Sequence, residues 1–443
     1  MNAPSLMRAE VIAIGDELTS GQRLDTNSQW LSERLGDLGI RVVYHTTVGD
    51  DLEAHARVMR EAIARADLVV SSGGLGPTAD DLTRHAIAQA AGVELVLDQA
   101  ALNHIRGLFG RRGRTMPPSN EVQAMFPRGS RVIPNPHGSA PGIDIDVQRP
   151  SGGGARTDTA EGQSSKGQVR IIALPGVPSE LKEMWHATVE PQLRAVSGGG
   201  VIVHRRIKCF GVGESDLEQM LPDLIRRGRE PTVGITVHRA TITLRITTSG
   251  ASPEACRAAI EPTAQTIYQC LGELVFGEED DELEHALVRV LAAQGKRLAV
   301  AEWGSGGLLS RRLGAADPSS AVFVGGVVVR SSDALRRALG VEPKLIEGRD
   351  PDGAATVAAM ATACRERFAA DYALAIGPFP AEGAESLARV HFAWADAEES
   401  RTASAPFASH WDVAPARAAK QALNHLRLAL VRARNPKQVA NPK

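Results

Sequence analysis

The sequence predicts an α/β protein of several domains, and three observations support this. Between Glu10 and Gly92, short apolar runs alternate with amphipathic segments, a pattern typical of right-handed βαβ crossovers and a largely parallel sheet. A similar alternation returns after Lys296. The chain of 443 residues is also too long for a single hydrophobic core. We therefore expect three domains, at residues 1–196, 197–276 and 277–436.

The first domain should begin with three strands that alternate with helices. The strands are AEVIAIGD, IRVVYHTTVGD and DLVVSSGG, and the helices run through SQWLSERLGDLG, through EAHARVMREAIARA and from about Asp80. A hairpin of APGIDIDV and VRIIALPG should follow. Its connection, QRPSGGGARTDTAEGQSSKGQ, is rich in glycine, serine and charge, so we interpret it as a mobile surface insertion rather than a functional lid.

The pattern changes after the SGGG segment at Ser197–Gly200. A small α+β unit should contain the strand VIVHRRIKCFG, a helix over Ser215–Arg227, the strands PTVGITV and TITLRIT, and a helix over Pro253–Leu271. The third unit opens with GEEDDELEHALVRVLAAQG, whose acids suit the positive end of a helix, so we prefer a solvated helix start to a metal site. It continues through KRLAVAE, AVFVGGVVV and YALAIGP, and a final helix spans PARAAKQALNHLRLALVRAR.

Composition favours a small-molecule substrate. Hydrophobic residues make up 43%, charged residues 23%, and the formal net charge is -2, which gives no indication of a nucleic-acid partner or of binding to an anionic membrane. No stretch is long and apolar enough to span a membrane. The four cysteines lie far apart, and the twelve histidines form no metal-binding motif. We expect a cytoplasmic protein with free thiols.

A glycine-rich turn is the first candidate site. Gly73, Gly74 and Gly76 follow a buried strand and precede a helix, so their amides can approach a phosphate without obstruction by side chains, and Thr78 adds a hydroxyl. Asp80 and Asp81 then place two carboxylates at the same position. Two carboxylates disfavour an anion unless a divalent cation lies between them. The turn therefore suggests metal-bridged phosphate chemistry.

Further acidic loops should meet this turn. Asp16 and Glu17 follow the first strand, and Asp50 and Asp51 follow the second. The carboxyl ends of parallel strands share one edge of the sheet, where ligands bind. The alternative, that Asp80 caps a helix and the glycines only turn the chain, explains one loop but not all three.

The loop Pro175–Pro178 should contribute to the same edge. It lies between a strand and a helix, and Gly176 allows close approach of a ligand. The alternative for this loop is a rigid helix start with Ser179 as cap.

Seven segments, taken together, resemble successive signatures of the CinA-like (competence/damage-inducible protein) family: AIGDEL, DTNSQWLSERL, VGDD, SSGGLGPTADDLT, RGRTMPPSNEVQA, IPNPHGSAPG and LPGVPSELKEMW. CFGVGESDLEQML and PTVGITV with TLRIT resemble the family's middle domain. The resemblance implies a three-layer α/β/α domain of the molybdopterin-binding (MoaB/MogA-like) fold, a KH-like middle domain and an α/β C-terminal domain. It also implies a homodimer.

For the first domain, the resemblance implies hydrolysis of ADP-ribose to AMP and ribose 5-phosphate, dependent on Mg²⁺, Mn²⁺ or Co²⁺. The metal-binding or water-activating acids would be Asp16, Asp50, Asp80 and Asp81. The residues lining the phosphate or nucleotide site would be Gly73, Gly74, Gly76, Thr78, Ser139 and Gly176. A metal would neutralise the diphosphate and lower the pKa of water, which agrees with this assignment. The alternative is a non-catalytic nucleotide- or pterin-binding sensor or scaffold.

The C-terminal domain of the family resembles a nicotinamide-nucleotide amidase, whose strand, turn and helix read A-E-S-C-T-G-G with serine as nucleophile. Here the segment reads AEWGSGG, and Trp303 stands at the nucleophile's position. The family's tyrosine and lysine correspond to Arg330 and Leu335, and its T-G-I-A-G-P loop is reduced to Ala375–Pro378. We therefore expect an inactive amidase.

Three interpretations of Trp303 follow. The indole fills the core or the former pocket, the turn Gly304–Gly307 still binds a nucleotide without turnover, or Ser305 serves another hydrolase. We favour the first. The third lacks a histidine or lysine at a matching position.

Overall fold

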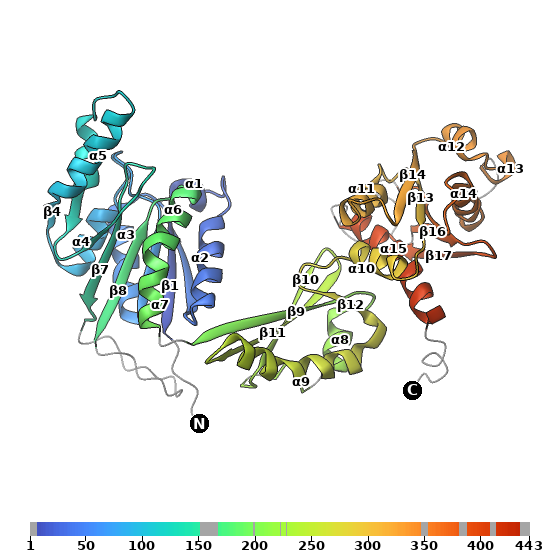
Figure 1. Cartoon of the computed structure of the whole chain (residues 1–443), viewed down its shortest axis with the longest axis horizontal. Coiled ribbons are helices and arrows are strands. Elements are labelled where there is room, and N and C mark those ends of the chain that lie inside the picture. The colour runs from blue at the N-terminus through green and yellow to red at the C-terminus, as the bar shows by residue number, and fades with distance from the viewer. Residues whose placement is uncertain are drawn as a thin grey trace. The chain divides into compact units, whose positions relative to one another are not determined.

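The structure is a computed structural model, and it describes residues 7–150, 167–197, 200–221, 223–226, 228–346, 353–380, 388–407 and 413–434. Most of the predicted surface insertion, residues 151–166, lies outside the described residues. The chain forms two compact units, Met1–Val203 with Thr248–Ala259 and His204–Thr247 with Ile260–Lys443 (Figure 1).

The first unit contains a six-stranded sheet of order β2-β1-β3-β8-β7-β6. Strands β2, β1, β3 and β8 are parallel, and β8, β7 and β6 pair antiparallel, so the predicted parallel sheet and hairpin are confirmed. The strands are β1 (Arg8–Ile14), β2 (Arg41–Val48), β3 (Leu68–Ser72), β6 (Arg131–Ile133), β7 (Gly142–Gln148) and β8 (Gln168–Leu174). A separate pair joins β4 (Leu95–Leu97) and β5 (Met125–Pro127).

Helices cover both faces of this sheet, which gives three layers (Figure 1). Strand β3 shows why, because Val69 packs on one face and its neighbours Leu68 and Val70 pack on the other. The first face receives α3 (Leu52–Arg65), α4 (Thr83–Ala91) and α5 (Gln99–Arg111). The second receives α2 (Thr26–Asp37), α6 (Pro178–Met184), the π-helical turn Trp185–Val189 and α7 (Glu190–Val196). The α/β fold class is thereby confirmed.

Two local differences from the prediction affect the cleft loops. Helix α4 begins at Thr83, not near Asp80, because residues 77–82 form a turn stabilised by Asp81. A short helix, α1 (Asp16–Thr19), follows β1 directly and was not predicted. A 3-10 helix at Pro118–Ala124 also borders the glycine-rich turn.

A four-stranded sheet of order β10-β11-β9-β12 follows along the chain. Its strands are β9 (Val201–Cys209), β10 (Thr232–His238), β11 (Thr241–Gly250) and β12 (Val275–Glu278), and its helices are α8 (Glu214–Met220) and α9 (Pro253–Leu271), followed by the 3-10 turn Gly272–Leu274. Helix α9 has the predicted bounds. Helix α8 ends at Met220, well before the predicted Arg227.

The C-terminal sheet has the order β14-β13-β15-β16-β17. Strand β13 (Leu298–Trp303) lies parallel to β14 (Phe323–Val329) and β15 (Tyr372–Ile376), whereas β16 (Arg389–Ala395) and β17 (Ser400–Pro406) add an antiparallel hairpin that was not predicted. The helices are α10 (Leu283–Ala292), α11 (Leu308–Ala316), α12 (Ser332–Leu339), α13 (Pro343–Ile346), α14 (Ala354–Arg367) and α15 (Ala414–Arg434).

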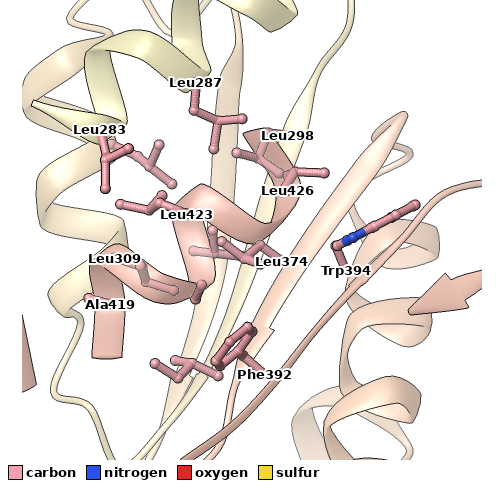
Figure 2. Packing of buried hydrophobic residues seen from close by; sticks show 14 of the residues in the cluster. Leu283, Leu287, Leu298, Leu309, Leu374, Phe392, Trp394, Ala419, Leu423 and Leu426 are labelled. Carbon is pink, nitrogen blue, oxygen red and sulfur yellow. The ribbon is translucent and has the colours of Figure 1, made fainter. Parts of the chain in front are cut away.

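This sheet also has a hydrophobic cluster on each face. Leu298 and Leu374 pack against leucines of α10, α11 and α15, as Figure 2 shows. The alternate residues of β13, Ala299, Ala301 and Trp303, pack on the other face with α12, α13 and α14. Within the described part of the chain, no helix is both long enough and apolar enough to cross a bilayer.

Candidate functional site

A cleft opens at the carboxyl edge of the parallel strands in the first unit, where the sequence predicted the site. It has a volume of about 490 Å³, within the range typical of small-molecule sites. Six segments line it: the end of β1 and the loops that follow it, the β2–α3 loop, the β3–α4 loop, the 3-10 helix, the β6–β7 loop and the β8–α6 loop.

The cleft brings together most of the predicted site residues. Its lining includes Asp50, Gly73, Gly74, Gly76, Asp80, Asp81, Ser139 and Gly176. Two predicted residues, Asp16 and Thr78, are not part of the lining but hydrogen bond to residues that are. These contacts place the three acidic loops beside the glycine-rich turn.

Asp16 and Asp50 are joined by a reciprocal pair of hydrogen bonds. The amide of Asp50 donates to Asp16 Oδ1 at 2.9 Å, and the amide of Asp16 donates to Asp50 Oδ2 at 3.1 Å. Burial raises the pKa of Asp50, and the negative charges of Asp16 and Asp80 raise it further. The Asp16 amide and the charge of His55 oppose this shift without cancelling it. Asp50 therefore holds a proton more readily than an ordinary aspartate.

The pKa of Asp80 is displaced in the opposite direction to that of Asp50. Its side chain is exposed, and interactions with the nearby Thr78 hydroxyl and with its own amide lower its pKa. Asp50 and Asp80, which both line the cleft, therefore have pKa values displaced in opposite directions, which is common where one carboxylate exchanges a proton and another stays ionised.

Asp81 lines the cleft but its carboxylate stabilises the turn. Oδ1 accepts from the Gly76 amide at 2.7 Å, and Oδ2 accepts from the Thr78 amide at 2.9 Å and from the Thr78 hydroxyl. These bonds satisfy much of its capacity as an acceptor. Its role as a metal ligand stays a prediction. Asp51 is comparable, because it caps α3 by accepting from the Ala54 amide at 2.8 Å.

We expect the change Asp81→Asn to lower the free energy of unfolding of this domain by about 1–2 kcal/mol, because the amide group retains only one acceptor oxygen. Chemical denaturation of the full chain, followed by the fluorescence of the first domain, measures the change. A variant as stable as the parent would show that the turn does not depend on these bonds.

The glycines allow the loops to approach each other closely. Gly74 has φ +65°, and a Cβ there would collide with the Thr83 hydroxyl, which donates to the Gly73 carbonyl at 2.9 Å. A Cβ on Gly176 would lie 3.5 Å from the Cα of Gly73, in ordinary van der Waals contact. The loops after β3 and β8 are thus in contact at the floor of the cleft.

Sequence reasoning missed several supporting residues. Arg84 is fully buried and donates to the carbonyls of Leu75, at 2.7 Å, and Gly76, at 3.4 Å. Asn135 is also buried; its Oδ1 accepts from the amides of His137 and Gly138, and its Nδ2 donates to Glu180 at 2.7 Å. The NPHG segment is a turn signal that points to Asn135, whereas nothing in the sequence distinguishes Arg84 from a surface arginine.

For this cleft to hold a divalent cation, substrate phosphates would have to complete the set of ligands that the described side chains supply. Among the described residues, no three or more histidine, cysteine or acidic side chains are grouped so that they could hold a metal ion. Mg²⁺ is commonly held by one or two carboxylates together with substrate phosphates. Asp80 would supply oxygen donors of this kind. Asp50 lies close enough for the charge of Asp80 to raise its pKa.

The turn after β13 begins in a packed hydrophobic cluster. Trp303 is only 7% exposed and packs in a cluster with Val329, Leu335 and Val357. Leu335, at the position of the family's lysine, is completely buried. Gly304 has φ +79°, and a Cβ there would lie 3.2 Å from Pro378, so the turn packs against the shortened loop. The indole therefore belongs to the core of this domain.

Ser305 forms a hydrogen bond with a buried carboxylate, that of Glu302. Its hydroxyl donates to Glu302 at 2.5 Å, and Glu302 also accepts from the amides of Leu309 and Ser310 at 3.0 and 2.7 Å. Glu302 is fully buried and thus satisfies the first amides of α11 from within the protein. The hydroxyl donates its proton to a structural carboxylate and not to a histidine or lysine.

Comparison with known proteins gives consistent matches along the chain. Residues 10–195 match the family model described as "Probable molybdopterin binding domain", residues 204–277 match "Damage-inducible protein CinA KH domain", and residues 280–430 match "CinA C-terminal domain".

Two relatives show the extent of the similarity. The chain is 36% identical over 379 residues to a CinA-like protein of a Synechococcus species, which covers 85% of this chain and 86% of the relative. It is 35% identical over 389 residues to a CinA-like protein of Parasynechococcus marenigrum, covering 87% and 88%. A solved CinA structure from Thermoplasma acidophilum has 33% identity and a TM-score of 0.35, and covers 42% of this chain and 98% of that one. By its matches to all three domains and to these relatives, the chain belongs to the CinA-like, competence/damage-inducible protein family.

Proposed function

We propose that the first domain hydrolyses a nucleotide diphosphate such as ADP-ribose to AMP and ribose 5-phosphate. One observation carries the proposal, namely that Asp50 and Asp80 line the same cleft as the glycine-rich turn and the Gly176 loop. Carboxylates beside close-approach backbone loops suit a phosphoanhydride whose charge is balanced by a cation. The resemblance of the sequence motifs to the CinA-like family implies the same activity.

The residues have separate roles in this proposal. Asp80 stays ionised and, with the substrate phosphates, would hold a divalent metal ion, which when bound would neutralise charge on the diphosphate. Asp50, whose pKa is raised, is suited to accept the proton of the attacking water. Asp16 orients Asp50 through their reciprocal hydrogen bonds. The attacking oxygen forms a new bond to phosphorus, and the bridging P–O bond breaks.

The test is an assay of the purified full chain against ADP-ribose and a panel of dinucleotides. We expect AMP and ribose 5-phosphate to form with Mg²⁺, Mn²⁺ or Co²⁺, and a chelator to stop the reaction. Chromatography measures both products. Tight binding without turnover would instead support the sensor or scaffold alternative, with a nucleotide or a pterin as ligand.

We infer further that the C-terminal domain has lost amidase activity. Trp303 offers no nucleophile, and its position is part of a packed hydrophobic cluster. Ser305 donates its proton to Glu302, and a buried Leu335 replaces the lysine. The close packing of Gly304 against Pro378 also disfavours a retained nucleotide site at this turn.

A further inference from the structure

We propose that Arg23 is a specificity-determining residue of the cleft, which binds the diphosphate of a nucleoside diphosphate ligand and thereby selects diphosphates over monophosphates. This inference rests on the proposed function, because it concerns the same cleft. It adds a residue that neither the family motifs nor the predicted site contained.

Arg23 lies where two cavities meet. It belongs to the segment between α1 and α2, and it lines both the main cleft and a smaller adjoining pocket. The two cavities also share Ile14, Glu17, Gly176 and Pro178. The smaller pocket has a volume of only about 30 Å³, so a ligand would occupy the main cleft, and one that extends from the glycine-rich turn toward the smaller pocket would pass Arg23.

The guanidinium of Arg23 is available to a ligand. Other arginines of the domain are paired, such as Arg65 with Glu10 at 2.7 Å and Arg149 with Asp67 at 3.0 Å. Within the described ranges, no carboxylate lies within ion-pair distance of Arg23. It stays unpaired although the other charged residues of the main cleft are carboxylates: Glu17, Asp50, Asp80, Asp81 and Glu180.

This distribution of charge specifies the ligand. Five carboxylates repel an anion, so an anionic ligand in this cleft needs positive charge near each phosphate. Asp80 with a cation could serve one phosphate, and the free guanidinium could bind the oxygens of the next one in a bidentate manner. A monophosphate or an uncharged ring would leave one of these two positive groups without a partner.

Hydrogen bonds hold the backbone of the segment that carries Arg23. The Arg23 amide donates to the Glu17 carbonyl at 3.0 Å. Asn27, in the first turn of α2, donates through Nδ2 to Ser72 Oγ at 2.8 Å and to the Gly176 carbonyl at 2.9 Å, which ties the end of this segment to the end of β3 and to the loop after β8. The segment is thus anchored to the floor of the cleft.

Two exposed apolar side chains, one next to Arg23 in the chain and one in the lining of the main cleft, favour a nucleoside ligand. Leu24, 85% exposed, lines the smaller pocket, and Val177, 50% exposed, lines the main cleft. Exposed apolar side chains at a polar cleft provide contact surface for a ribose or a base.

The experiment compares Arg23→Ala, Arg23→Lys and a control, Arg41→Ala, in the full chain with a divalent cation present. Arg41 is exposed and begins β2, at the edge of the sheet opposite the cleft. We expect Arg23→Ala to raise the KM for ADP-ribose by at least about tenfold, and likewise the calorimetric Kd, which is measured with a methylene-bridged ADP-ribose wherever the parent hydrolyses ADP-ribose, while kcat and the Kd for AMP change by less than about threefold. Arg23→Lys should recover part of the affinity, and Arg41→Ala should behave as the parent.

The outcomes separate this inference from the proposed function. If the parent binds ADP-ribose but does not hydrolyse it, the proposed hydrolysis fails, and the calorimetric comparison still decides the role of Arg23. An unchanged Kd in Arg23→Ala overturns the inference even if hydrolysis is observed. An equal loss of affinity for AMP and ADP-ribose also overturns it, because Arg23 would then not select diphosphates. No binding of ADP-ribose by the parent overturns both.

Discussion

The variant Asp80→Asn is expected to lower kcat/KM for ADP-ribose by about a hundredfold or more while leaving the thermal stability of the protein unchanged. Asp80 is exposed and its side chain does not cap α4, so removing its charge should not disturb the fold. The removed charge would hold the cation that offsets the diphosphate, and a hundredfold loss corresponds to about 3 kcal/mol of transition-state stabilisation. Steady-state kinetics with Mn²⁺ and a thermal melt measure the two quantities.

A matched control is Asp37→Asn. Asp37 is an exposed aspartate at the end of α2, paired with Arg34 at 2.9 Å, and it does not line the cleft. This change should leave both activity and stability close to those of the parent. Full activity of Asp80→Asn, with its dependence on metal retained, would exclude Asp80 as the residue that holds the cation.

The paired aspartates show what the sequence could and could not predict. The strand pattern correctly predicted that the three acidic loops lie at one edge of the sheet, because parallel strands have their carboxyl ends together. It could not tell the members of each pair apart. In the structure, Asp51 and Asp81 each accept backbone amides of their own turn, although Asp81 lines the cleft together with Asp50 and Asp80.

Local turn geometry accounts for that difference. A carboxylate one to three residues before a helix can cap it, close the preceding turn or face solvent, and residue type alone does not distinguish two adjacent aspartates. Arg23 was missed for a related reason, because its role depends on which carboxylates do not reach it. The absence of a partner is a property of the folded chain, and no spacing in the sequence encodes it.

The C-terminal sheet was predicted only in its parallel part. Strands β13, β14 and β15 are apolar runs that follow helical segments, so their pattern is clear. Strand β17 reads SRTASAP, with small and polar residues on a largely exposed edge, and Thr402 is the single β-branched or aromatic residue in it. Its pairing with β16 is therefore a tertiary effect that the local sequence does not show.

The variant Trp303→Ser tests the proposed loss of amidase activity. We expect neither the parent nor this variant to release ammonia from nicotinamide mononucleotide, because a serine alone would still lack the base that Leu335 has replaced. The structure adds a second expectation. Removing an indole that is only 7% exposed from a packed cluster should lower the free energy of unfolding of the C-terminal domain by about 3–5 kcal/mol.

Two measurements separate the structural role of the indole from a vestigial catalytic one. Urea denaturation of the full chain should show a transition at a lower urea concentration for Trp303→Ser than for the parent. Trp303→Phe should lose less stability than Trp303→Ser, because the phenyl ring fills part of the same space. A coupled assay for ammonia measures any amidase activity of the parent and the variants. Ammonia release by Trp303→Ser without loss of stability would mean that the pocket and its base survive, and that the tryptophan only covers a competent site.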